Sequence, residues 1–162
     1  MTSYPLILSS ITPREAIADA LLRCFIGIDH NDAAVFKSAF AGEDIYLSHS
    51  SMPKPFTSLS ALTAGMFTRV GPLDTTHMLS NVRIDYEKDE DTANMTAYAL
   101  CQHAPPGQGK QPDGPKYTTG VAYTVGVVRN KEDGLWKISK AVLEVVWTQG
   151  DQTIMGGPPP AT

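Results

Sequence analysis

The stretch YTTGVAYTVGVVRNKEDGLWKISKAVLEVVW, residues 117–147, decides the fold class of this chain. Its two halves, residues 117–129 and 135–147, are rich in β-branched and aromatic side chains, and the turn-forming run NKEDG separates them. Two such runs joined by a short connection that contains glycine predict a long β-hairpin. Two more long strands are predicted before it, over residues 76–86 and 93–103. Four long strands in direct succession predict an antiparallel sheet.

Helical periodicity dominates the first part of the chain. The run TPRE at residues 12–15 has a Thr N-cap, a Pro at the first helical position and a Glu three residues after the cap. Apolar residues then recur at helical spacing as far as Ile28, so the first helix is expected to end near residues 29–31. A second helix, capped by Asn31 or Asp32, is expected directly after it and a third from Ser58, with one short strand, residues 45–49, between them.

Helices followed by a curved antiparallel sheet predict an α+β architecture. The expected shape is a cone-shaped half-barrel, in which the sheet wraps around the N-terminal helices and the mouth of the apolar interior can bind a small molecule. The length of 162 residues suits one domain, expected over residues 1–155 and followed by a flexible Pro/Gly tail at 156–162. Residues 104–116, with four prolines and three glycines, are expected to form a long loop, either a lid or an ordinary exposed loop.

Charge and composition narrow the range of partners. The net charge is -4 and the basic residues are scattered, so no nucleic-acid partner is expected. No run approaches the roughly 18 apolar residues that a membrane-spanning helix needs, so no membrane partner is expected either. Cys24 and Cys101 fall in a helical and a strand pattern and lack zinc-type spacing. These features predict a cytoplasmic protein with reduced thiols.

The candidates for chemistry are the histidines and the carboxylates near them, because no Gly-rich phosphate loop, GxSxG or HExxH motif is present. Asp29 ends the first helix, where the helix dipole opposes a carboxylate. His77 begins a strand, and His103 ends the next one. From the residue types alone, a catalytic role and a solvated position at the end of an element are equal alternatives for these three. His30 and His49 are expected at the surface.

The order of these residues resembles scytalone dehydratase and the SnoaL-like proteins, in the superfamily of nuclear transport factor two and ketosteroid isomerase. The resemblance rests on Asp29 after a helix, on Thr75-Thr76-His77 opening a strand and on His103 closing the next. It extends from about residue 12 to about residue 150 and includes three further matches: GVAY at 120–123, DGLWK at 133–137 and VW at 146–147.

The resemblance implies the same cone-shaped fold and a cofactor-independent dehydratase, isomerase or cyclase. It implies that Asp29 and His103 are hydrogen-bonded inside the cone and that His77 faces them. A carboxylate on one ring nitrogen fixes the tautomer of a histidine and raises the basicity of the other nitrogen, while a second histidine can donate or relay a proton. The resemblance also implies a homodimer or homotrimer. Trp136 and Trp147 are expected to be core and interface residues instead of substrate contacts.

The sequence departs from the family pattern at the positions that orient the substrate. A family tyrosine before the aspartate is replaced by Ile28. A second falls near Ser48, where a small shift of the strand would bring the neighbouring Tyr46 or His49 into the site. A serine and an asparagine on the long strand correspond to Thr124 and Gly126. The substrate is therefore expected to be a hydrophobic polyketide- or terpenoid-like compound other than scytalone. The expected substrate contacts are Phe25, Tyr46, His49, Met66, Met95, Thr124 and Val145.

Two other functions remain open from the sequence. A non-catalytic small-molecule-binding or dimerisation module can use the same scaffold, since a fold alone does not fix a function. It predicts that the three candidate residues point apart or that side chains fill the cone. A metal enzyme is the other alternative, because two or three histidines and a carboxylate can hold iron or zinc. The preferred hypothesis needs neither metal nor cofactor.

Overall fold

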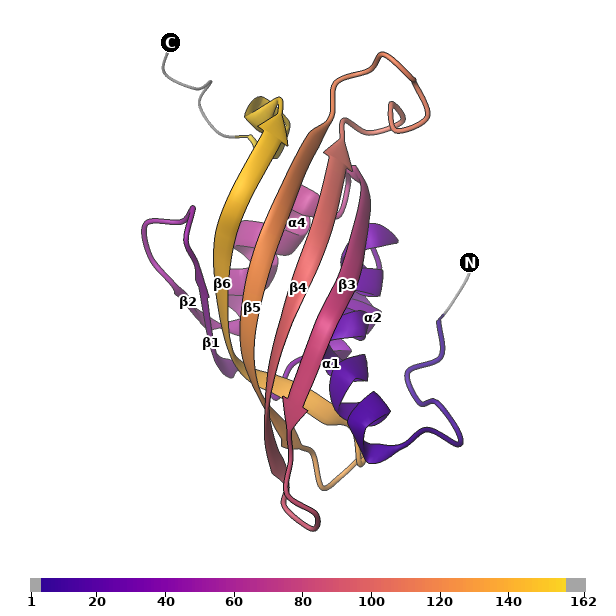
Figure 1. The fold of residues 1–162 in the computed structure, drawn as a ribbon, viewed down its shortest axis with the longest axis vertical. Coiled ribbons are helices and arrows are strands. Elements are labelled where there is room, and N and C mark those ends of the chain that lie inside the picture. Colours follow the sequence, from indigo (N-terminus) through magenta and orange to yellow (C-terminus); the bar gives the residue numbers. More distant parts are fainter. Residues whose placement is uncertain (1–3, 157–162) are drawn as a thin grey trace.

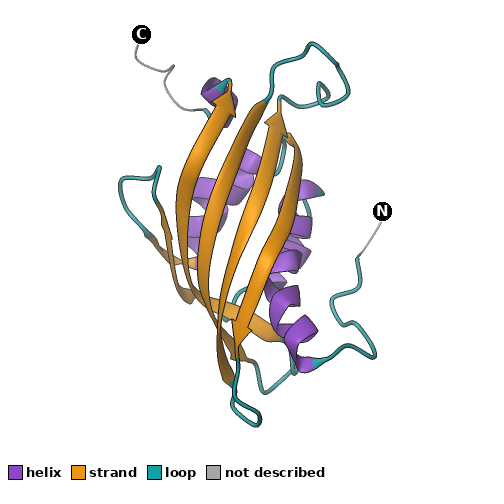
Figure 2. Ribbon diagram, in the orientation of Figure 1, coloured by secondary structure: helices purple, strands orange, loops and turns teal. Residues whose placement is uncertain are grey.

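A computed structural model describes residues 4–156, in which a curved six-stranded sheet wraps around the N-terminal helices (Figures 1 and 2). The architecture is α+β, as predicted, with an open cone in place of a closed barrel. The elements in chain order are α1 (Pro13–Asp29), α2 (Ala33–Ser38), β1 (Asp44–His49), β2 (Phe56–Ser58), α3 (Leu59–Leu62), the π-helical turn η1 (Thr63–Phe67), α4 (Thr68–Val70), β3 (Asp74–Asp85), β4 (Thr92–Ala104), β5 (Tyr117–Arg129), β6 (Trp136–Gly150) and the 3₁₀ turn η2 (Gln152–Met155).

The predicted helix signals act as expected. The Thr12 hydroxyl accepts a hydrogen bond from the Glu15 backbone N–H, and the Glu15 carboxylate accepts one from the Thr12 N–H at 2.6 Å. This reciprocal capping box fixes the first turn of α1. Asp32 caps α2 by accepting from the N–H groups of Ala34 and Val35. Local sequence therefore places both helix starts without help from the rest of the fold.

The sheet has the strand order β2-β1-β6-β5-β4-β3. Strands β3 to β6 are antiparallel neighbours, as predicted, but β1 pairs with β6 in parallel. The expectation of a purely antiparallel sheet is therefore wrong for this pair. The backbone after α2 already bonds to β6 through Ala41 and Ile138, so β1 continues beside β6 in the same direction. Strand β2 was not predicted, because it is only three residues long and follows Pro53 and Pro55.

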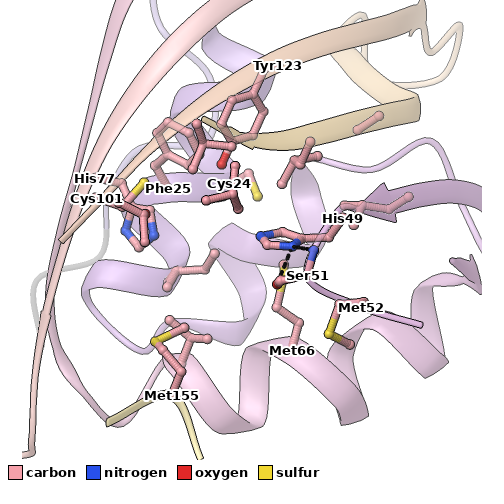
Figure 3. Close-up of a pocket in the computed structure, with 18 of the residues that line it drawn as sticks. Cys24, Phe25, His49, Ser51, Met52, Met66, His77, Cys101, Tyr123 and Met155 are labelled. Atoms are coloured by element: carbon pink, nitrogen blue, oxygen red, sulfur yellow. Dashed lines mark hydrogen bonds between the residues drawn. The ribbon is translucent and has the colours of Figure 1, made fainter. Parts of the chain in front are cut away.

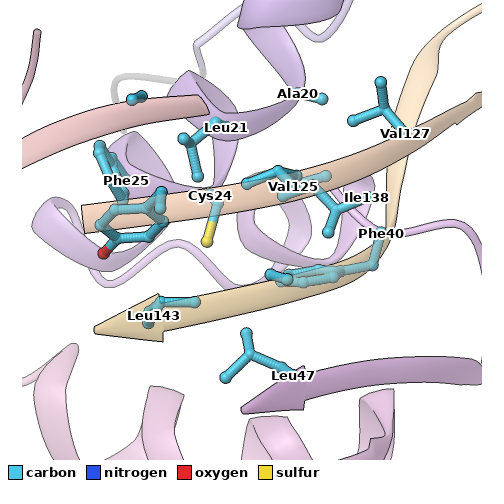
Figure 4. Close-up of a cluster of buried hydrophobic side chains, with 14 of the residues drawn as sticks. Ala20, Leu21, Cys24, Phe25, Phe40, Leu47, Val125, Val127, Ile138 and Leu143 are labelled. Carbon is cyan, nitrogen blue, oxygen red and sulfur yellow. The ribbon is translucent and has the colours of Figure 1, made fainter. Parts of the chain in front are cut away.

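Three register shifts bend the long strands: one in β3, between Ser80 and Arg83, and two in β6, where Val146 and Ser139 are extra residues opposite Gly120/Val121 and Gly126/Val127 of β5. Bulges of this kind increase local twist and curvature. The curved sheet encloses α1 on its concave side, and buried apolar side chains from both pack together between them (Figure 4). Trp136 belongs to this core, whereas Trp147 lies across Gly120 on the opposite, outer face of the sheet.

One buried ion pair joins α1 to the elements around it. Arg23 is 3% exposed and donates to the Asp19 carboxylate at 2.8 Å. Its remaining N–H groups bond to the backbone carbonyls of Ser38 and Trp136, each at 2.5 Å. A buried guanidinium is tolerable only when its donors are satisfied in this way. These contacts fix the end of α2 and the start of β6 against the middle of α1.

The predicted loop at residues 104–116 is held in place by polar contacts. The Asp74 carboxylate accepts from the N–H groups of Gly107 and Gly109, and the Lys116 ammonium donates to backbone carbonyls of the loop.

The predicted flexible tail lies outside the described residues, except for Gly156. The proposed division into a domain at 1–155 and a tail stays a prediction.

Helices α1 and α2 make their closest approach at Gly27. A Cβ at this position would lie 2.4 Å from the backbone nitrogen of Phe36, where neither helix can give way easily. We expect Gly27→Ala to destabilise the fold by about 1–3 kcal/mol, because overpacking exceeds the gain of up to ~1 kcal/mol from better helix propensity. The control is Gly126→Ala, whose Cβ would meet its nearest neighbour, in Lys140, at 3.8 Å. Urea unfolding measures both, and equal stabilities would contradict this packing.

Candidate active site

A cavity of about 220 Å³ lies between the concave face of the sheet, α1 and the helical segment from α3 to α4 (Figure 3). Most of its wall is apolar, as in typical small-molecule sites. Polar side chains interrupt the apolar wall, among them His49 from β1, His77 from β3, His103 from β4 and Tyr123 from β5. The apolar lining includes Leu21, Phe25, Leu47, Met66, Val121, Leu143 and Val145.

The Asp29 carboxylate, at the end of α1, accepts three hydrogen bonds from the start of β3. Its Oδ1 accepts from the Thr75 hydroxyl at 2.7 Å and from Nδ1 of His77 at 2.6 Å. Its Oδ2 accepts from the backbone N–H of His77 at 2.9 Å. A carboxylate can only accept when ionised, so Nδ1 of His77 carries a proton, and the ring is locked in orientation.

This contact also sets the charge of His77. Burial by itself lowers the pKa of His77, but the bond to Asp29 and the adjacent Cys101 raise it, with a result of about 9. For Asp29, burial raises the pKa, but the hydrogen bonds from His77 and Thr75 outweigh burial, so the pKa is lowered. At neutral pH the pair is therefore an imidazolium bonded to a carboxylate.

His103 lies next to His77 and has the opposite tendency. The ring centroids are 5.4 Å apart and the ring planes cross at 86°. Burial, and then the positive charge of His77, lower the pKa of His103 to about 4, so its ring is neutral at pH 7. Its Nδ1 lies 3.2 Å from the Tyr117 carbonyl oxygen and must donate to it, since a carbonyl only accepts. Nε2 therefore keeps its lone pair, on a ring that lines the cavity.

His49 contributes a third ring to the cavity wall, from the end of β1 (Figure 3). Its Nδ1 lies 3.2 Å from the backbone nitrogen of Ser51 and 2.8 Å from the Ser51 hydroxyl. Because a backbone N–H only donates, Nδ1 must accept, and the proton of the neutral ring sits on Nε2. Burial lowers the pKa of His49, which favours this neutral form.

Comparison with known proteins agrees with this architecture. A family model of the SnoaL-like domain matches residues 9–142, most of the chain. The chain belongs to the SnoaL-like family. The terrestric acid biosynthesis cluster protein E of Penicillium crustosum is 33% identical over 156 residues, which cover 94% of this chain and 97% of that protein. The family resemblance inferred from the sequence is confirmed.

Solved structures share the fold of this SnoaL-like chain at low sequence identity. A protein of Novosphingobium aromaticivorans, provisionally named a scytalone dehydratase, has a TM-score of 0.68 and 24% identity, with 83% of this chain and 85% of that chain covered. A hexachlorocyclohexane dehydrochlorinase, LinA-type3 of Novosphingobium barchaimii, has a TM-score of 0.65 and 20% identity, with coverages of 90% and 94%. At these identities the likeness shows the cone-shaped fold of nuclear transport factor two-like proteins.

Within this SnoaL-like cone, the predicted hydrogen bond between Asp29 and His103 is wrong. Asp29 bonds to His77 instead, because α1 packs along the edge strand β3 and its last residue meets that strand first. His103 is one strand further in, where its backbone pairs with Thr75 and its ring bonds to Tyr117. The three predicted catalytic residues do lie together, in the order Asp29, His77, His103.

Four of the seven predicted substrate contacts line the cavity: Phe25, His49, Met66 and Val145. The other three do not. Tyr46 points outward from β1, under the Lys140 ammonium, because Ile45 and Leu47 take the inward positions. Met95 points inward but is packed in the narrow end of the core, at 1% exposure. Thr124 is on the outer face of β5, one residue away from the inward Tyr123.

The sequence interpretation missed several polar groups at the site. Thr75 was quoted only as part of a motif, yet its hydroxyl bonds to Asp29. Tyr123 and the Tyr117 carbonyl were not singled out. Alternation along β5 is unbroken from Tyr117 to Val127, so counting in twos from Val121 or Val125 would have identified Tyr123 as an inward residue.

Among residues 4–156, no group of three or more His, Cys, Asp and Glu side chains is arranged to hold a metal ion. In the same range, no helix has the length and apolar character needed to cross a bilayer.

We expect His77 to keep its proton up to about pH 9. In Asp29→Asn the side chain keeps its size but loses its charge, so burial dominates and the pKa of His77 should fall below the ordinary value of about 6.5. Asp74→Asn is the matched control, because this nearby carboxylate on β3 bonds to Gly107 and Gly109 instead of a histidine. Nitrogen-15 NMR of the imidazole rings measures both titrations. An unchanged titration of His77 in Asp29→Asn would contradict the role of the carboxylate.

Proposed function

We propose that this chain is a cofactor-independent acid–base enzyme of the lyase or isomerase type, a dehydratase, isomerase or cyclase. One observation carries the proposal. Two adjacent histidines in an apolar cavity hold opposite protonation states at neutral pH, His77 charged with a pKa of about 9 and His103 neutral with a pKa of about 4. Environments that push the pKa values of neighbouring groups apart are how one site supplies both an acid and a base.

In a dehydration, Nε2 of neutral His103 would take the proton from a carbon next to a carbonyl. Protonated His77 would give its proton to the departing hydroxyl, which leaves as water, and the C–O electron pair goes with it. The products are an unsaturated carbonyl compound and water, with the proton now on His103. Transfer of that proton back to His77 restores the starting state, and the low pKa of His103 favours this transfer. Isomerisation or cyclisation would use the same two groups.

The substrate class follows from the lining and from the relatives. Apolar side chains from α1, β1, β5 and β6 surround the histidines, so the bound compound should be hydrophobic. The similarity to a protein named for a terrestric acid biosynthesis cluster supports a role in secondary metabolism. A polyketide- or terpenoid-like compound fits both. Buried free thiols at Cys24 and Cys101 suit a reducing compartment such as the cytoplasm.

A non-catalytic binding module on the same fold is the second candidate, because the cavity by itself would also serve binding. Transfer of a substrate C–H proton to solvent separates the two functions. Only an acid–base enzyme speeds this exchange, whichever reaction follows the first proton transfer.

We expect the wild-type protein in deuterated water to exchange the carbon-bound protons next to the carbonyl in cyclic 3-hydroxy ketones. His77→Gln and His103→Gln should each slow this exchange by about 10²–10⁴-fold, the usual contribution of an acid–base group. Tyr46→Phe is the control, because Tyr46 lies outside the cavity. NMR of the ketones measures the rates. If both histidine variants exchange as fast as the wild type, the enzyme proposal fails.

The homodimer or homotrimer expected from the family is proposed to form through the outer face of the sheet. A row of side chains crosses four strands there: Met78, Leu100, Gly120 and Trp147 are consecutive cross-strand partners. The three large members of the row are 39–47% exposed. An apolar row of this extent on one face marks a contact surface more often than a solvated one.

Trp147→Glu should dissociate this assembly, because a carboxylate would be buried without a partner at the contact. Thr92→Glu places the same charge at the first residue of β4, away from the apolar row, and should leave the assembly unchanged. Sedimentation velocity measures the mass of each. A wild-type protein that is monomeric at micromolar concentration would refute the proposed contact.

A further inference from the structure

Tyr123 brings an unassigned hydroxyl group into the same cavity. Its ring projects from the middle of β5 toward the side of the cavity where Cys24 and Phe25 lie (Figure 3). The residue is only 7% exposed, so little of the phenol can reach bulk water. A buried tyrosine normally finds a hydrogen-bond partner for its hydroxyl.

The Tyr123 hydroxyl has no such partner among residues 4–156. In that range, every side-chain nitrogen or oxygen that is fully closed off from solvent has a hydrogen-bond partner. The Tyr123 hydroxyl has none, so it is not closed off and borders space large enough for a water molecule. Because Tyr123 lines the cavity, that space is the cavity. The hydroxyl is thus free to bind an oxygen atom of a ligand there.

The surroundings keep this hydroxyl a neutral donor. Burial, followed by the adjacent Cys101 and Cys24, raises the pKa of Tyr123 well above its usual value. Thiols are weak acceptors and compete poorly for the phenol proton. The O–H group is therefore available, uncharged, over the whole range in which His77 is protonated and His103 is neutral.

The Phe25 ring contacts both the Tyr123 phenol and the His77 imidazolium. The Phe25 ring lies edge-on to Tyr123, with centroids 5.6 Å apart, and also packs against His77, with centroids 5.2 Å apart. The phenol ring and the imidazolium ring therefore both pack against the same rigid side chain. A compact ligand beside Phe25 can meet both groups without a rearrangement of the protein.

We infer that the Tyr123 hydroxyl donates a hydrogen bond to a substrate carbonyl oxygen, and that the substrate is an uncharged cyclic ketone or enone. This inference rests on the proposed function. When His103 removes the proton next to the carbonyl, the electron pair of the C–H bond moves to the carbonyl oxygen, and an enolate forms. A donor already aimed at that oxygen stabilises the enolate more than the ketone, which lowers the barrier to proton removal.

The charge balance of the cavity favours a neutral substrate over a carboxylate. The positive charge of His77 is offset by its bond to Asp29. Arg69, the one Lys or Arg side chain in the lining, is exposed and bonded to the Met155 carbonyl. A single phenol donor without a free cation nearby suits a carbonyl oxygen, whereas a buried carboxylate would lack a counter-charge.

The test compares Tyr123→Phe with Tyr98→Phe, which removes an exposed phenol from the outer face of β4. The probe is 4-nitrophenolate at about pH 8, because its negative oxygen imitates an enolate and His77 stays protonated there. Loss of one hydrogen bond to a charged oxygen should weaken its Kd by about 10–100-fold in Tyr123→Phe. The exchange rate of the cyclic ketones should fall by about 10²–10³-fold in kcat, with little change in KM. Tyr98→Phe should match the wild type in both.

Thermal unfolding must first show that Tyr123→Phe is folded, as expected for a change that removes one atom and keeps the ring. If Tyr123→Phe binds 4-nitrophenolate like the wild type, the hydroxyl does not contact the ligand oxygen, and the inference is overturned. If the exchange rate also survives in Tyr123→Phe but is lost in His77→Gln and His103→Gln, the acid–base function stands without Tyr123. If the histidine variants keep full exchange, the proposed function fails, while phenolate binding still decides whether Tyr123 is a donor.

Discussion

The three hydrogen bonds to the Asp29 carboxylate connect the helix, the sheet and the cavity. Strand β3 is an edge strand with only β4 beside it, so some of its backbone N–H groups face away from the sheet. Asp29 accepts one of these groups, the N–H of His77, together with the ring of the same residue and the Thr75 hydroxyl. One carboxylate thereby satisfies a free sheet edge, orients a histidine and joins the end of α1 to the wall of the cone.

The same contact separates the charges of the two histidines. A buried imidazole resists protonation, and His103 follows this rule. The His77 side chain is also largely buried, at 7% exposure, yet the adjacent carboxylate reverses the effect of burial and its pKa rises. The positive charge on His77 then lowers the pKa of His103 further. A single ion pair in an apolar cavity is therefore enough to make two identical residue types behave as an acid and a base.

The apolar walls matter as much as the polar groups. The cavity lies between the curved sheet, α1 and the α3–α4 segment, in space that their side chains leave unfilled. At the narrow end the same alternation of inward residues packs solidly, as at Met95 and Val125. Position along the strand, and not residue type, thus decides whether an inward side chain becomes core or lines the cavity.

The sequence by itself determined the features that depend on near neighbours in the chain. The capping box at Thr12, the Asp32 cap and the strands at 117–129 and 135–147 follow from contacts within a few residues, and the predicted α+β cone followed from their order. Only the tertiary structure decided which histidine meets Asp29, because that depends on which strand α1 packs against. It also decided that Tyr123, and not Thr124, faces the cavity: alternation separates the two faces of β5, but only packing against Phe25 of α1 shows which face is inward.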